Sequence, residues 1–202
     1  MVAQIIITVM TLRRKILKWI YPLLRKAAEK GNNGLVLENK KNSTPPTSFY
    51  SLTMTDNKGQ TIPISAYTGK YILLVNTASD CGYTPQYADL QKLYEQYADK
   101  LIVLGFPAND FKEQERGTDD EIASFCQINY GVTFPLAQKS VVMPGSIQNP
   151  VFKWLTTPAL NGWNNQPPVW NFSKYLVNPE GILTHYFGPA VAPKDIGPYL
   201  KA

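Results

Sequence analysis

The chain has 202 residues, which is enough for one sizeable hydrophobic core. Its two cysteines are too few for a disulfide-stapled secreted scaffold, and its single histidine leaves little room for a zinc site of nitrogen and sulfur ligands. The net charge of +5 is unevenly divided: residues 1–45 carry nine Lys or Arg against two Glu, whereas residues 46–202 carry eleven against thirteen acidic residues. Because the basic excess lies in the N-terminal arm and not on a folded domain, we expect no nucleic-acid partner.

The first 45 residues predict a basic arm and a linker, and the linker composition extends from residue 31 to residue 47. Residues 2–10 are apolar but too short to cross a bilayer, and no positive residues precede them as in a signal peptide. Residues 11–30 have the pattern of a basic amphipathic helix with Trp19 as an interfacial anchor. This pattern favours weak peripheral contact with an anionic membrane. A poor signal sequence and a plain disordered lead-in are the alternatives, and Met10 is a second candidate start.

Residues 46–202 predict one α/β domain. Two continuous apolar runs flank a segment with helical apolar spacing, which indicates a parallel strand-helix-strand unit. Thr118 stands three residues before Glu121, the signature of a capping box that opens a helix. The patterns predict, in chain order, a hairpin around 57–59, a strand at 71–75, a helix at 87–97, a strand at 101–106, a helix from 119, an edge strand at 141–142, a short helix at 150–155, a hairpin of 174–177 with 182–187, and a closing helix at 193–200. This order is that of a thioredoxin-like fold, a mixed central sheet with helices on both faces.

Cys81 lies on the turn between the strand at 71–75 and the helix that follows it, and Pro85 suits the first helical turn. Unpaired N–H groups and the helix dipole favour a negative charge at such a place. The position therefore predicts a thiol that ionises readily and reacts as a thiolate. A buried structural cysteine is the alternative, since free cysteine packs as a small hydrophobe.

Several short motifs occur in order, and together they resemble the glutathione peroxidase family in its cysteine-containing, non-selenium form. They are NTASDCG at 76–82, LGFPANDF at 104–111, QERG at 114–117, YGVTFP at 130–135 and WNF at 170–172. The resemblance spans roughly residues 48–200. It implies an antioxidant thiol peroxidase that reduces hydrogen peroxide and organic or lipid hydroperoxides without a cofactor.

The resemblance also implies a catalytic tetrad of Cys81, Gln114, Trp170 and Asn171. The two amides and the indole N–H are neutral donors, which can hold a sulfur anion and polarise the departing oxygen without a histidine base. Without the resemblance, the tryptophan would be interpreted as a packed aromatic, the asparagine as a turn cap and the glutamine as a solvated loop residue.

In family members that use thioredoxin, a resolving cysteine lies in a segment that FCQINYGVTFP at 125–135 matches, which implies this role for Cys126. The alternative is a packed core cysteine on the apolar face of its helix. The implied reductant is thioredoxin or glutathione. Because a disulfide needs Cα atoms within about 7 Å, we expect the helix or the loop before it to loosen during turnover. Ala108 stands where many relatives have cysteine. Arg116 replaces the proline of the family motif, so the loop that carries Gln114 is expected to be less rigid.

Other classes fit the residues less well. A thioredoxin would need C-x-x-C and a peroxiredoxin T-x-x-C, and neither motif includes Cys81. A membrane-tethered peroxide sensor that relays oxidation to a partner protein would use the same cysteines. The resemblance implies a monomer, because family members with longer insertions than the region at 161–168 tend to be tetramers. We expect a cytoplasmic protein, peripheral to the inner face of the membrane.

Overall fold

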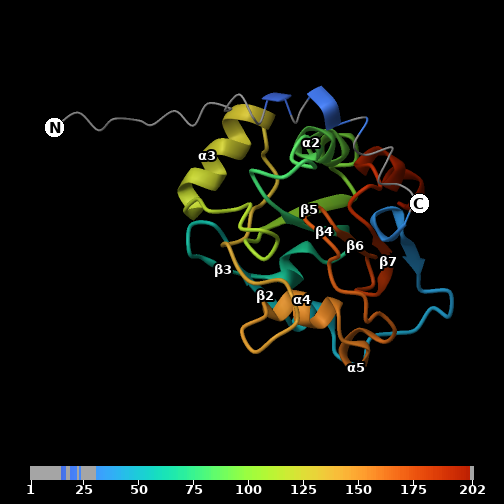
Figure 1. Cartoon of the computed structure of the whole chain (residues 1–202). Coiled ribbons are helices and arrows are strands. Elements are labelled where there is room, and N and C mark those ends of the chain that lie inside the picture. Colours follow the sequence, from blue (N-terminus) through green and yellow to red (C-terminus); the bar gives the residue numbers. More distant parts are fainter. Residues whose placement is uncertain (1–14, 17–18, 22, 24–30, 201–202) are drawn as a thin grey trace.

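The computed structural model describes residues 15–16, 19–21, 23 and 31–200. A five-stranded sheet lies at the centre in the order β1-β7-β6-β4-β5, and only the β4–β5 pair is parallel (Figure 1). The strands are β1 Val36–Glu38, β4 Tyr71–Thr77, β5 Leu101–Pro107, β6 Lys174–Val177 and β7 Leu183–Phe187. A separate two-stranded sheet pairs β2 Thr53–Thr55 with β3 Thr61–Pro63.

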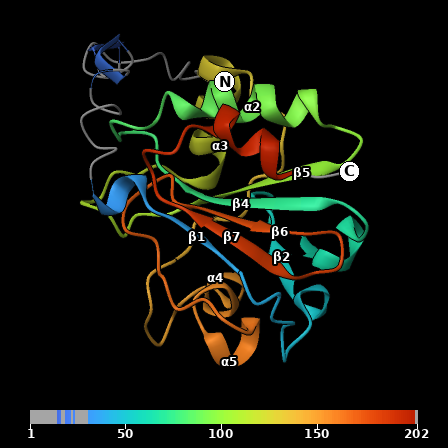
Figure 2. The ribbon, with the colours of Figure 1, turned by 90° about the vertical axis from the view of Figure 1, so that its right-hand side faces the viewer.

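Helices cover both faces of the central sheet (Figure 2). The α2 and α3 helices, Gln86–Gln96 and Asp119–Tyr130, lie on one face with the 3-10 helix Pro193–Tyr199, and α4 Pro150–Leu155 and α5 Pro158–Asn161 lie on the other. Alternate side chains of β4 enter the two cores, since Leu73 packs with α2 and α3 whereas Leu74 packs with α4. The thioredoxin-like fold and the mixed sheet predicted from the sequence are confirmed.

The strand-helix-strand unit is also confirmed, with Ile72 opposite Ile102 in the parallel register. Thr118 and Glu121 form the predicted capping box, in which the Thr118 hydroxyl accepts from the Glu121 N–H and the Glu121 carboxylate accepts from the Thr118 N–H. The hairpin of β6 and β7 is present, with a bulge between Leu176 and Val177.

Three predicted elements are corrected. The linker expected at 31–47 contains β1, which pairs with β7 as an edge strand of the central sheet. Residues 141–142 form no strand, because the Val142 N–H donates to the Asp110 carboxylate at 3.1 Å and not to a neighbouring strand. The closing helix is a 3-10 helix with Pro198 inside it. The hairpin predicted around 57–59 is confirmed as the β2–β3 pair, which forms a small sheet outside the central one.

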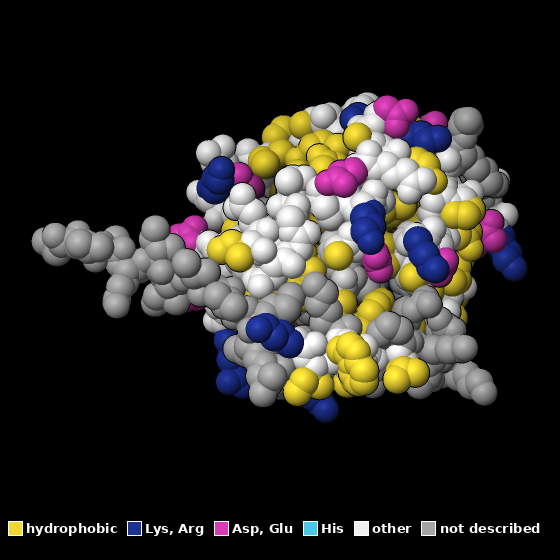
Figure 3. Space-filling view, turned by 90° about the horizontal axis from the view of Figure 1, so that it is seen from above, with side chains coloured by type: hydrophobic (Ala, Val, Ile, Leu, Met, Phe, Trp, Pro, Cys, Tyr) yellow, Lys and Arg dark blue, Asp and Glu magenta, His cyan; other side chains and the backbone are white. Residues whose placement is uncertain are grey.

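The arm contributes one anchored aromatic side chain to the domain. Tyr21 is helical and buried, and its ring meets the Tyr83 ring edge-on at 6.3 Å between centroids. Ile16, Trp19 and Leu23 are exposed, with Trp19 at 83%. Within the described residues no helix is long and apolar enough to span a bilayer. Seen from above, basic and acidic side chains of the described residues are interspersed on the domain surface (Figure 3).

Candidate active site

Cys81 sits in a tight turn between β4 and α2. It lies four residues before Pro85, the N-cap residue of α2, and the first helical residue is Gln86. Thr84 fixes this turn, because its hydroxyl oxygen accepts from the Cys81 N–H at 3.0 Å and lies 2.8 Å from the carbonyls of Ala78 and Cys81. The Tyr83 N–H donates to the Cys81 Sγ at 3.4 Å. The sulfur therefore meets backbone donors of the turn itself, and only 1% of the residue is exposed.

Trp170 and Asn171 lie near the same sulfur, on the turn that leads into β6, and hydrogen bonding from their side chains lowers the pKa of the Cys81 thiol. The turn is strained, since Phe172 adopts the left-handed region with φ 68°, which is rare for a bulky side chain. Asn76, the next-to-last residue of β4, fixes it: its side chain donates to the Trp170 carbonyl at 3.1 Å and its carbonyl accepts from the Phe172 N–H at 2.6 Å. The strain is thus maintained by β4 at the place where the two donors face Cys81.

Gln114 comes from the loop that joins β5 to α3. Its side-chain oxygen accepts from the Asn171 amide at 3.0 Å, and its backbone carbonyl accepts from the Asp80 N–H at 3.0 Å. The loop reverses through Lys112 and Glu113, which both adopt left-handed backbone angles, with φ of 53° and 51°. The structure therefore brings together all four residues of the sequence-predicted tetrad, with Gln114 contacting the group through Asn171.

The electrostatics of Cys81 differ from the expectation of a readily ionised thiol. Burial raises the pKa of the Cys81 thiol above its ordinary value, and the donors from Tyr83, Trp170, Asn171 and Gly82 only partly offset this rise. The expectation of a lowered pKa is therefore wrong for this closed structure. The donors favour a sulfur anion, against the larger opposing effect of burial.

Cys126 lies apart from this group of donors. It is fully buried on α3, beside the hydroxyl of Tyr87 from α2. Burial raises the pKa of its thiol to about 12, and the nearby charge of Glu115 adds to the rise. Both cysteines are free thiols. In this state Cys126 is a poor nucleophile, because almost none of it is ionised near neutral pH.

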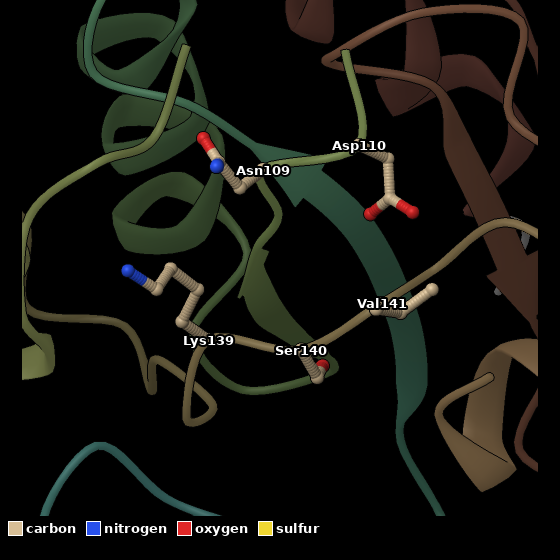
Figure 4. A pocket seen from close by; sticks show the side chains of 5 residues that line it. All are labelled: Asn109, Asp110, Lys139, Ser140 and Val141. Atoms are coloured by element: carbon tan, nitrogen blue, oxygen red, sulfur yellow. The ribbon is translucent and has the colours of Figure 1, made fainter. Parts of the chain in front are cut away.

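A pocket of about 360 Å³ opens beside the Gln114 loop (Figure 4). Asn109 and Asp110 form one wall, and Lys139, Ser140 and Val141 form the facing one. The Asn109 side-chain oxygen accepts from the Glu115 N–H at 2.9 Å, so one pocket wall also braces the loop that carries Gln114. The pocket gives solvent access to the outer side of this loop.

Sequence reasoning missed four residues that shape the site: Asn76, Thr84, Phe172 and Glu115. The motifs contain three of them, but a motif does not reveal that Asn76 braces the tryptophan turn or that Phe172 has a left-handed backbone. The described residues contain no group of three or more His, Cys, Asp or Glu side chains that could hold a metal ion.

The fold and the site define a peroxidase built on a thioredoxin-like scaffold, and comparisons with known proteins agree. The glutathione peroxidase family profile matches residues 49–156. The chain is 45% identical over 150 residues to "Glutathione peroxidase homolog BsaA" of Staphylococcus epidermidis, covering 74% of this chain and 94% of that protein. It is 42% identical over 149 residues to "Glutathione peroxidase-like peroxiredoxin HYR1" of Saccharomyces cerevisiae, covering 73% of this chain and 91% of that protein.

Among solved structures, the chain is similar to T. cruzi GPX1, with a TM-score of 0.60 and 26% identity over 76% of this chain and 94% of that one. It is also similar to Trgpx in its apo form, with a TM-score of 0.58 and 32% identity over 76% and 93%. The chain belongs to the glutathione peroxidase family, in its cysteine-containing type. It is an oxidoreductase that acts on peroxide.

Proposed function

We propose that this thiol peroxidase reduces hydrogen peroxide and organic or lipid hydroperoxides with Cys81, resolves the product with Cys126, and is recycled by thioredoxin. The observation that carries the proposal is the convergence of the Trp170 and Asn171 donors on the Cys81 sulfur, with Gln114 bonded to Asn171. Neutral donors of this kind favour charge that develops in a transition state. The role in antioxidant defence follows from this chemistry.

In the first step the Cys81 sulfur attacks one peroxide oxygen and the O–O bond breaks. The departing oxygen takes up the proton that the thiol loses, so the products are a sulfenic acid and an alcohol, or water from hydrogen peroxide. In the second step the Cys126 sulfur attacks the sulfenic sulfur, a disulfide forms and water leaves. The two thiols of a thioredoxin then reduce the disulfide and become oxidised themselves.

The choice of thioredoxin over glutathione rests on the presence of Cys126 as a second thiol, which an intramolecular disulfide requires. Ala108 is fully buried and supplies no thiol. Cys126 is the one cysteine of the chain besides Cys81. The short turn at 161–168, closed by hydrogen bonds of Asn161 and Asn164, supports a monomer.

Peripheral contact with the inner face of an anionic membrane belongs to the same proposal. Tyr21 is anchored on the domain, whereas Ile16, Trp19 and Leu23 lie at helical spacing and are exposed. With nine basic residues in the first 45, these exposed apolar side chains suit an anionic lipid surface. The arm thereby brings the enzyme close to lipid hydroperoxides.

The test is a peroxidase assay with thioredoxin or glutathione as reductant and hydrogen peroxide or an anionic-vesicle lipid hydroperoxide as substrate. We expect many turnovers with thioredoxin and slower turnover with glutathione. Because Trp19 is exposed, the Trp19→Ser variant should lose activity on the vesicle lipid hydroperoxide and keep its activity on hydrogen peroxide. A single oxidation without turnover by either reductant would favour the peroxide sensor. Equal vesicle activity in Trp19→Ser would remove the membrane contact from the proposal.

The Trp170→Phe variant is expected to slow the first step by about 100-fold, the size of effect that one transition-state donor supplies. Phenylalanine keeps an aromatic ring against Phe111, whose centroid lies 5.4 Å from that of Trp170, and removes only the indole donor. Stopped-flow oxidation of Cys81 by hydrogen peroxide measures the step. Trp163→Phe is the matched control, because the Trp163 indole donates to the Leu183 carbonyl away from the sulfur. Equal rates of Cys81 oxidation in the two variants would show that the Trp170 indole does not assist the first step.

A further inference from the structure

Glu115 is a buried carboxyl group that the reaction described above does not use. It follows Gln114 directly, lies in the loop that leads into α3, and is only 1% exposed. Such burial disfavours a charged carboxylate strongly unless a cation pairs with it. No Lys or Arg forms an ion pair with Glu115 within the part of the chain that the structure describes.

Two hydrogen bonds of Glu115 join the Cys81 turn to the start of the 108–118 loop, and its charge acts on α3. Its carboxylate accepts from the Ser79 hydroxyl at 3.2 Å, two residues before Cys81, and its backbone N–H donates to Asn109 at 2.9 Å. Its charge also acts on the Cys126 thiol of α3 and raises the pKa of that thiol. Glu115 thus links the Gln114 loop to the Cys81 turn, and its charge also affects the helix that carries the second cysteine.

Four charged or titratable groups surround Glu115. Asp80 disfavours its ionisation and Lys139, at the edge of the pocket in Figure 4, favours it. Cys126 and Tyr87 face it from α3 and α2, and its charge raises the pKa of both. Burial outweighs the single nearby cation and the Ser79 hydrogen bond, and raises the pKa of Glu115 to about 7.

We propose that Glu115 is a proton-operated latch on the 108–118 loop: its protonated side chain holds the loop closed against the Cys81 turn, and loss of the proton releases the loop and α3 so that Cys126 can approach Cys81. The last part rests on the proposed function, in which the two sulfurs must meet. Glu115 is a positioning residue, since it acts through the loop and touches neither peroxide nor the Cys81 sulfur.

The direction of the pH effect follows from the two states of the loop. The ordinary pKa of 4.5 applies when the loop opens into water, and the value of about 7 applies when it is closed. The latch is fully closed below the lower value, weakens as the pH rises between the two, and stays weak above the higher one. The difference between the two pKa values limits the increase in the population of the open loop to about 300-fold.

The latch is tested by alkylation of Cys126 in full-length Cys81→Ser protein, in which Cys126 is the only thiol. Iodoacetamide rates are measured with Glu115 present and with Glu115→Gln, which keeps a neutral acceptor for Ser79 and cannot ionise. The alkylation rate with Glu115 is divided by the rate with Glu115→Gln. This ratio cancels the pH dependence of the Cys126 thiol itself, because both proteins share it. Between about pH 5.5 and pH 8.5 this ratio should rise by about 10- to 30-fold, since the open form gains population as Glu115 ionises.

Glu113→Gln is the matched control, because Glu113 lies in the same loop and its side chain is 70% exposed. This variant should keep the pH dependence of the parent protein. A pH dependence in Glu115→Gln that equals that of the parent would overturn the latch.

A second measurement needs no variant of Glu115. Carbon-13 NMR of the Glu115 carboxyl, assigned through its backbone, should give a midpoint near 7, and a midpoint near the ordinary value of 4.5 would also overturn the latch. Neither measurement uses peroxide or a reductant. A failed latch and a failed peroxidase cycle therefore give separate results.

Discussion

Replacement of Cys81 by serine should abolish peroxide reduction, with a loss of at least about 1000-fold, because a hydroxyl in this site has no comparable nucleophilicity. The fold should persist, since serine is similar in size and Thr84 still fixes the turn through its backbone contacts. The measurement is peroxide consumption in the presence of excess thioredoxin, with the unfolding temperature as a check of structure.

The control for Cys81→Ser is a variant that leaves the first step intact, and Cys126→Ser serves this purpose. Residual activity of Cys81→Ser within tenfold of the parent would show that another group reduces the peroxide. Because the chain has only two cysteines, such a result would leave Cys126 as the alternative thiol.

Replacement of Cys126 by serine should separate the two halves of the cycle. We expect the variant to consume one equivalent of peroxide, accumulate sulfenic acid on Cys81 and then stop, because no second thiol displaces the sulfenic oxygen. Mass spectrometry after trapping of the sulfenic acid measures the product, and thioredoxin oxidation measures turnover. The loss of thioredoxin-dependent turnover should be at least about 100-fold.

Cys126 is fully buried, so a serine hydroxyl at this position costs about 1–3 kcal/mol of stability if it lacks a partner. Cys126→Ala, which buries no polar group, controls for this cost and should stall in the same way. Full turnover of both variants with thioredoxin would make Cys126 a packing residue and leave resolution of the sulfenic acid to the reductant.

Both expectations require movement, since Cys126 packs behind α2 beside Tyr87 in a closed core. The aromatic rings around it include the contact of Tyr87 with Tyr130 at 5.6 Å and that of Phe125 with Tyr130 at 5.8 Å between centroids. Opening of α3 away from α2 must break the Tyr87–Tyr130 contact, whereas Phe125 and Tyr130 both belong to α3. In the proposed latch, the loop before α3 is where the energy of opening is adjustable, because no Lys or Arg among the described residues forms an ion pair with Glu115.

Much of this molecule could be predicted from the sequence because the relevant signals are local. The apolar run of β4, the helical spacing of α2 and the capping box at Thr118 each depend on a few neighbouring residues, and all three appear in the structure. The tetrad could be named because short motifs identify family members, even though its residues are up to 90 positions apart, from Cys81 to Asn171. Residues 141–142 show the limit, since a side chain of another segment took the hydrogen bond that a strand would need.

Tertiary structure decided the properties that depend on burial. Cys81 stands where a local argument predicts an easily ionised thiol, yet the closed core removes water from it and raises its pKa. Glu115 lies in the QERG motif, but no pattern in the sequence indicates its burial, and only the fold places its carboxyl against the Cys81 turn, where its charge acts on α3. The segment before residue 47 has a linker's composition, but the free edge of β7 recruits Val36–Glu38 as a strand. Sequence determines which groups are present and how the backbone turns nearby, whereas desolvation and edge pairing arise only when distant segments meet.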